Sequence, residues 1–163
     1  MVLAFRNLTI TPQAPVSQWP TEAVQAAIER GDLADWHRIA AEIRVSPWGA
    51  TARQLEEVLS YAHPYGVSEA MQAVLSRARE RAEADERATV AAAIQQAVER
   101  SGLSQAEFAS KIGTSPSRLS TYASGKVTPS AALMIRISRV AEQETARRDC
   151  IWHRRSEPQP DTE

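Results

Sequence analysis

The chain has 163 residues, 43% of them hydrophobic, a formal net charge of −1 and one cysteine. This length suits one domain or two small ones, and no apolar run approaches the ~20 residues that a membrane-spanning helix needs. One cysteine excludes an intrachain disulfide. Because the first residues also lack the basic and then apolar pattern of a secretory signal, we expect a cytoplasmic protein.

Charge is distributed unevenly along the chain. Residues 101–155 contain nine Lys and Arg against four acidic residues, an excess of five. Residues 1–80 contain seven Arg against nine acidic residues, a deficit of two. Such asymmetry is typical of a chain in which one part binds nucleic acid and the other does not.

Residues 1–80 are predicted to form a small helical domain. The first eleven residues alternate weakly between apolar and polar, which suits a short strand or an extended arm. Beyond them, apolar residues recur at helical spacing in four segments that Pro, Gly and Asp residues separate. We expect Thr21 to cap the first of these helices, Asp32 or Asp35 to open the second and Ser68 to start the fourth.

Trp19, Trp36 and Trp48 are the large side chains of this part. Three indoles among short helices are expected to form its core. The alternative is that one of them is an exposed anchor for a protein partner. Neither His37 nor His63 has cysteine or acidic neighbours at zinc-ligand spacing, so the sequence predicts no metal site.

A long helix is predicted between the two parts. The stretch from Leu75 to Glu99 contains no Gly or Pro and is rich in Ala, Arg and Glu, which favours a continuous exposed helix. A helix from Ser68 to Ser101 would be ~50 Å long at 1.5 Å per residue. Its apolar positions fade near Asp85, so we expect a hinge or domain boundary near residues 82–88.

A capping box opens the most informative segment, residues 102–141. Ser104 is followed three positions later by Glu107, which predicts the start of a helix. Phe108 and Ile112 then fall on one face. Gly113 can take the left-handed conformation that ends a helix.

A second short helix is predicted directly after this turn. Thr114 or Ser115 can cap it, and Pro116 suits its first turn, where a missing N–H is tolerated. Leu119 and Tyr122 would face inward. Two short helices joined by a tight turn are the layout of a helix-turn-helix, whose second helix lies in the major groove of DNA.

The segment ends with a loop and a further helix. Gly125 breaks the second short helix, and Pro129 with Ser130 opens the next. Its large apolar residues are expected to pack back on the motif: Leu133, Ile135, Ile137 and Val140.

These residues resemble the Cro/cI-type (XRE) helix-turn-helix family, to which phage repressors belong. The similar stretches are GLSQAEFA, IGTSPSRLS, SGKVTPS and ALMIRISRVA. With the preceding helix, about Ala88 to Arg100, the resemblance covers about a third of the chain. One position departs from the family: many members carry an acidic residue where this chain has Ala123, so a local salt link is in question.

The resemblance implies which residues contact DNA. By position in the family, the base-reading residues are Pro116, Ser117, Arg118 and Thr121. Arg118 is the strongest of them, because a guanidinium can make a bidentate contact to guanine. The residues expected at phosphates are Gln105, Ser115, Ser120, Lys126 and Thr128.

The sequence therefore predicts an all-α chain with a helical partner-binding or regulatory domain at 1–80, a helix-turn-helix domain at 84–155 and a disordered tail at 156–163. We expect a sequence-specific transcriptional regulator that acts as a repressor, either on its own or as an autoregulating antitoxin. It is expected to bind palindromic DNA as a homodimer and to bind a protein such as a toxin through residues 1–80. The alternative is an interaction adaptor whose helix-turn-helix does not read DNA. Because catalytic and nucleotide-binding motifs are missing from the sequence, neither an enzyme nor a cofactor is predicted.

Overall fold

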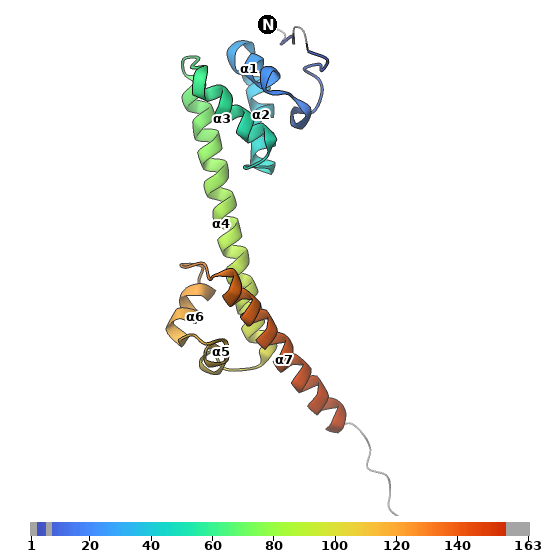
Figure 1. The fold of residues 1–163 in the computed structure, drawn as a ribbon, viewed down its shortest axis with the longest axis vertical. Helices are drawn as coiled ribbons and strands as arrows, with labels where there is room; N and C mark the ends of the chain where they lie inside the picture. Colours follow the sequence, from blue (N-terminus) through green and yellow to red (C-terminus); the bar gives the residue numbers. More distant parts are fainter. Residues whose placement is uncertain (1–2, 6–7, 156–163) are drawn as a thin grey trace, which may run out of the picture. The chain divides into compact units, whose positions relative to one another are not determined.

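The structure is a computed structural model that describes residues 3–5 and 8–155. Within these ranges the regular elements are all helical, as predicted (Figure 1). They are the 3-10 helix η1 (Val16–Gln18) and the α-helices α1 (Thr21–Arg30), α2 (Leu33–Val45), α3 (Ala50–Tyr61), α4 (Val67–Ser101), α5 (Gln105–Ile112), α6 (Pro116–Ala123) and α7 (Ala131–Arg155). The chain divides between Ala84 and Asp85 into two compact units, here called unit 1 and unit 2.

Unit 1 packs α1, α2, α3 and the first part of α4 around one apolar core. The largest fully buried side chains of this core are Val24, Ile28, Ile39, Ile43, Leu55 and Val58. Asp32 caps α2 and forms a capping box with Asp35. The expected cap at Thr21 is wrong: α1 begins at Thr21 itself, and Pro20, which can satisfy no amide through its side chain, holds the cap position.

The N-terminal segment packs on this core without forming a strand in its described part, residues 3–5 and 8–11. Leu3 is buried, and the ring of Phe5 meets Trp19 edge-on with 5.1 Å between the ring centroids. Leu8 and Ile10 also contact the core. The described residues of this segment are therefore held on unit 1 by their buried apolar side chains.

The three tryptophans of unit 1 differ in burial. Trp19 is buried, and its indole N–H donates to the Ala14 carbonyl at 3.1 Å. Trp36 is half-buried and donates to the Ala27 carbonyl at 2.9 Å. Trp48 is 45% exposed, so the expectation that all three form the core is wrong for this residue. The chain turns at the buried Pro47, which leaves the next side chain facing outward.

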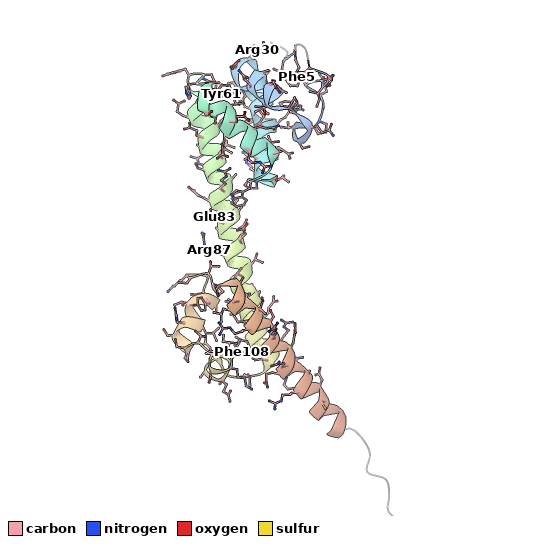
Figure 2. All side chains as sticks on the ribbon, viewed as in Figure 1. Phe5, Arg30, Tyr61, Glu83, Arg87 and Phe108 are labelled. Carbon is pink, nitrogen blue, oxygen red and sulfur yellow. The ribbon has the colours of Figure 1, made fainter. Side chains whose placement is uncertain are left out.

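Helix α4 runs unbroken from Val67 to Ser101, in agreement with the continuous helix expected from its composition. Its last turns supply Ile94 and Ala97 to the core of unit 2. The same core contains Leu119 of α6 and Phe108 of α5, which is labelled in Figure 2. This core holds the helix-turn-helix segment in place.

Helix α7 closes the core of unit 2 through one stripe of side chains. Leu133, Ile137 and Ala141 lie four residues apart and are buried. Ile135 was expected to pack with them but is 52% exposed. Two residues correspond to about 200° around an α-helix, so Ile135 lies opposite the stripe. The tail predicted at 156–163 lies outside the described residues.

Candidate nucleic-acid interface

Helix α5 begins with the predicted capping box. The Ser104 hydroxyl oxygen accepts the amide N–H of Glu107 at 3.3 Å, and the Glu107 carboxylate accepts the Ser104 amide at 2.9 Å. The Ser104 hydroxyl and amide, which donate to this carboxylate, lower the pKa of Glu107 below its ordinary value. The capping box thereby satisfies two of the amides that the start of α5 would otherwise leave without a partner.

The turn between α5 and α6 depends on Gly113. Its φ of 74° lies in the left-handed region, which a residue with a Cβ enters only at a cost. The Arg136 guanidinium, reaching from α7, donates to the Ile112 carbonyl at 3.1 Å. This contact satisfies a carbonyl at the end of α5, which has no partner within its own helix.

Helix α6 presents a buried face and an outward face. The Ser115 hydroxyl accepts the Arg118 amide at 3.2 Å and caps the helix, and Pro116 occupies its first position. Leu119 and Tyr122 are buried against the core, as predicted. Four other side chains of this helix are exposed: Pro116, Ser117, Arg118 and Ser120.

The four predicted base-reading residues all belong to α6. Pro116, Ser117 and Arg118 are exposed, and Thr121 is half-buried. The Thr121 hydroxyl donates to the Arg118 carbonyl at 2.7 Å, so its oxygen remains available as an acceptor. The Arg118 guanidinium makes no ion pair or hydrogen bond with the described residues.

The five predicted phosphate contacts come from three places in unit 2. Gln105 is the first residue of α5, whereas Ser115 and Ser120 belong to the cap and body of α6. Lys126 and Thr128 lie on the loop after α6, and the Lys126 amide donates to the Thr121 carbonyl at 3.1 Å, which joins this loop to the helix. All five side chains are exposed.

The charge of this region is positive throughout. No Asp or Glu occurs between Glu107 and Glu142, whereas the same stretch contains five basic residues: Lys111, Arg118, Lys126, Arg136 and Arg139. Lys111 pairs with Glu144 of α7 at 2.8 Å, and its hydrogen bond lowers the pKa of that carboxyl. Arg118 on the outward face of α6 and Lys126 on the following loop are therefore positive charges without a neighbouring described carboxylate, and they would attract a polyanion.

Sequence reasoning missed the residue that anchors the end of α6. The Gln95 side chain, on α4, donates to the Ala123 carbonyl at 2.6 Å. A backbone carbonyl thus accepts the hydrogen bond at the position where many family members have an acidic side chain.

A second contact missed from the sequence involves the later turns of α7. The Arg148 guanidinium donates to the Arg100 carbonyl, and the Thr145 hydroxyl lies 3.1 Å from the same oxygen and 2.8 Å from the Ala141 carbonyl, to either of which it can donate. Arg148 lies so close to Gly102 that a Cβ there would approach its Nη1 to 2.4 Å. No pattern in the sequence links residues this far apart, so this contact carried no sequence signal.

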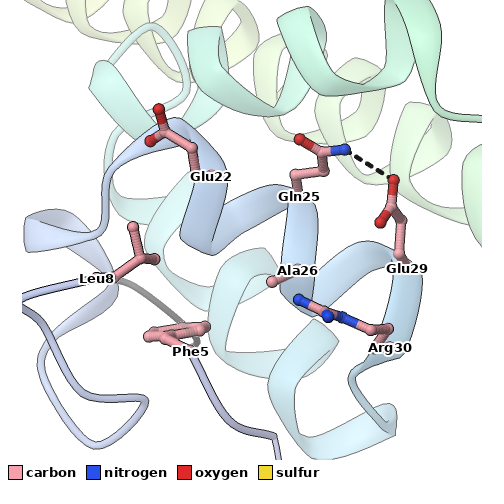
Figure 3. A pocket seen from close by; sticks show the side chains of 7 residues that line it. All are labelled: Phe5, Leu8, Glu22, Gln25, Ala26, Glu29 and Arg30. Carbon is pink, nitrogen blue, oxygen red and sulfur yellow. Dashed lines mark hydrogen bonds between the residues drawn. The ribbon is translucent and has the colours of Figure 1, made fainter.

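Outside this region, the described residues line several shallow hollows. The described residues include no group of three or more His, Cys, Asp or Glu side chains that could hold a metal ion. A hollow of about 540 Å³ lies beside α1, where Phe5, Leu8 and Ala26 meet the polar residues Glu22, Gln25, Glu29 and Arg30 (Figure 3). In the described ranges, no helix combines the length and apolarity required to cross a membrane.

The comparisons agree with this geometry. Residues 94–142 match the sequence model of a family described as helix-turn-helix. Neither a curated protein nor a solved structure matches the chain. The matched residues begin in α4 at Ile94, include α5, α6 and the loop between α6 and α7, and end one residue beyond the buried Ala141. The match places a helix-turn-helix segment at residues 94–142, in agreement with the resemblance to the Cro/cI-type family that the sequence indicated.

Proposed function

We propose that the protein is a sequence-specific transcriptional repressor that reads DNA with α6. The observation that carries the proposal is the outward face of α6, which is exposed, carries no carboxylate and is fixed from behind by the buried Leu119 and Tyr122. A rigid helix with small hydroxyl side chains and one arginine suits close approach to base edges in the major groove.

Within this proposal, some exposed residues of unit 2 contact bases and others contact phosphates. Arg118 donates to a guanine, and Pro116, Ser117 and Thr121 make the shorter contacts to neighbouring bases. The phosphate contacts come from the hydroxyl, amide and ammonium groups of Gln105, Ser115, Ser120, Lys126 and Thr128, which set the register of α6 on the duplex.

We further propose that two copies bind one palindromic operator. One helix-turn-helix contacts few base pairs, and dimers of such modules bind two half-sites about one helical turn apart. A two-fold operator with this spacing, bound by two chains, is the expected arrangement. A mass measurement on the DNA complex that finds one chain per duplex contradicts it.

The experiment that tests the function is binding of the full chain to the DNA upstream of its own gene. Fluorescence anisotropy with that duplex and with a scrambled duplex of equal length gives the two affinities. We expect a specific affinity at least ~10³-fold higher than the nonspecific one. Equal and weak binding to both duplexes supports the alternative, an interaction adaptor whose helix-turn-helix does not read DNA.

We propose that unit 1 binds a protein partner, which makes an antitoxin role the specific form of this function. Three large aromatic side chains of unit 1 are at its surface: Trp48, Tyr61 and Tyr65, with 45%, 52% and 101% of their area exposed. Aromatic residues are enriched at protein interfaces and at their binding hot spots. Calorimetry with the product of the adjacent gene tests this, and Trp48→Ala is expected to weaken the complex by ~2 kcal/mol.

A further inference from the structure

Unit 1 contains a second basic surface that the helix-turn-helix does not include. A shallow groove of about 590 Å³ lies where the end of α2 meets α4, and its lining residues are Arg44, Val74, Arg77, Ala78, Glu80 and Arg81. Ala78 is buried and Val74 packs against the core of unit 1, so these two form an apolar floor. The three arginines form the rim, which we call the arginine groove.

The charge of the arginine groove is opposite to that of the unit that carries it. Residues 1–84 contain eight arginines and ten acidic residues, so unit 1 is negative by two charges. The groove nevertheless has three guanidinium groups against the single carboxylate of Glu80. A local concentration of exposed positive charge creates a positive potential that attracts an anionic ligand.

The three guanidinium groups are exposed and available. Arg44, Arg77 and Arg81 make no hydrogen bond or ion pair with any residue that the structure describes. Arg79, on the same helix, is held instead by the Glu56 carboxylate and the Pro47 carbonyl. The groove arginines therefore do not serve the fold in the way that Arg79 does.

Their spacing suits a row of phosphates. Arg77 and Arg81 lie four residues apart on α4 and so share one face of the helix, with about 6 Å between their Cβ atoms. Guanidinium groups bind phosphate oxygens through paired N–H donors, which makes arginine the preferred residue for this ligand.

We propose that the arginine groove binds backbone phosphates of the DNA that flanks the operator. The inference rests on the proposed function, because the helix-turn-helix of the same chain brings duplex DNA to the protein. Protein-binding hot spots are enriched in Trp and Tyr as well as Arg, and the lining residues include arginines but no aromatic side chain. The exposed aromatic residues of unit 1, Trp48, Tyr61 and Tyr65, all lie outside the groove lining.

The test compares two double variants of the full chain that remove equal charge from unit 1. Arg77→Gln with Arg81→Gln changes the groove. Arg30→Gln with Arg53→Gln is the matched control, because both of these arginines are exposed and neither lines the groove. Thermal unfolding of each variant establishes that unit 1 keeps its fold.

Affinity is measured against salt concentration, on the operator alone and on the operator extended by about one helical turn on each side. The control is expected to gain affinity from the extension, as the unchanged protein does. The groove variant is expected to lose this gain, and its log–log salt slope is expected to fall by about two relative to the control. Its preference among operator sequences should stay unchanged, since phosphates carry no base information.

The inference is overturned if both double variants show the same salt slope and the same dependence on duplex length. A groove variant that binds DNA like the control but no longer binds a protein partner of the chain also overturns it, and assigns the groove to that partner. Failure of the proposed function gives a separate result: the unchanged protein then binds the operator and scrambled DNA equally.

Discussion

The side-chain amide of Gln95 donates a 2.6 Å hydrogen bond to the carbonyl oxygen of Ala123, the last residue of α6. The bond joins the end of the helix proposed to read DNA to a helix that is firmly packed in the core of unit 2. The acceptor is a backbone carbonyl, so the bond does not depend on which side chain occupies position 123.

Replacing Gln95 by alanine should therefore loosen α6. We expect Gln95→Ala to lower the free energy of unfolding by about 1 kcal/mol, the usual net value of one hydrogen bond, and to weaken operator binding. Gln96→Ala, at the neighbouring exposed position with no described hydrogen bond, is the control. Gln95→Arg keeps a donor and should restore binding. If both alanine variants behave alike in denaturation and anisotropy, the bond has no role in positioning α6.

Arg118→Ala should reduce operator affinity by about 1–3 kcal/mol and relax the preference at one base pair. The reason is the loss of a bidentate contact to guanine, which no other exposed side chain of α6 can make. Arg118→Lys keeps the charge but loses the paired donors, so it should lose the base preference as well. Anisotropy on a set of operators with single base changes measures both effects. Equal weakening on operator and random DNA would place Arg118 at a phosphate.

Lys126→Ala should weaken binding to every DNA sequence by a similar factor and lower the salt slope by about one. Lys126 is exposed on the loop after α6, where an ammonium group contributes charge and little geometric selectivity. Affinities at several salt concentrations give the slope, and Arg53→Ala in unit 1 is the control. A slope equal to that of the control would remove Lys126 from the DNA contacts.

The pair of Lys111 and Glu144 should make unit 2 sensitive to acid. Its hydrogen bond lowers the pKa of Glu144 below the ordinary value of 4.5 in the folded protein. As the pH falls through this ordinary value, Glu144 takes up a proton in the unfolded chain before it does so in the folded protein. The stabilisation that the ion pair provides at neutral pH is therefore lost progressively. Denaturant titrations from neutral pH down to about pH 3 should show a smaller loss for Glu144→Gln than for the unchanged chain.

Glu142→Gln is the control for this comparison, because Glu142 is an exposed carboxylate on the same helix and makes no ion pair with a described residue. It should follow the unchanged chain over the whole range. Identical acid profiles for all three proteins would show that the contact with Lys111 adds nothing to stability.

A fragment of residues 84–155 should fold by itself and bind DNA. Its core is supplied by α4 from Ile94 onward together with α5, α6 and α7, so no apolar residue of unit 1 is needed to complete it. Circular dichroism should show a helical protein with a cooperative thermal transition. An unfolded fragment would mean that the two units depend on each other, and the proposed division of function would have to be given up.

Much of unit 2 could be predicted from sequence because its signals are local. The capping box of Ser104 and Glu107 and the left-handed turn at Gly113 each act within a few residues, and all appear in the structure as expected. Apolar spacing also identified the inward faces of α5 and α6. The face of α7 was predicted less well, because Ile135 is as apolar as the buried residues beside it and only the helical angle separates them.

The contacts that sequence reasoning missed join distant segments. Gln95 with Ala123 and Arg148 with Arg100 involve polar side chains, which have no periodicity that could reveal a partner. Trp48 was misjudged for a related reason, since the size of an indole favours burial but the direction of the turn at Pro47 decides it. The arginine groove was hidden because its arginines come from two helices of a unit whose net charge is negative.

Two side chains of α7 near the Arg100 carbonyl, Thr145 and Arg148, lie beyond residue 142, where the match to the family ends. Arg148 donates to this carbonyl at the end of α4, and the Thr145 hydroxyl lies within reach of the same oxygen. Substitutions at these two positions would change how firmly the bundle holds together without touching the face of α6. Selection can therefore adjust the lifetime of this protein in the cell independently of the DNA sequence that it prefers.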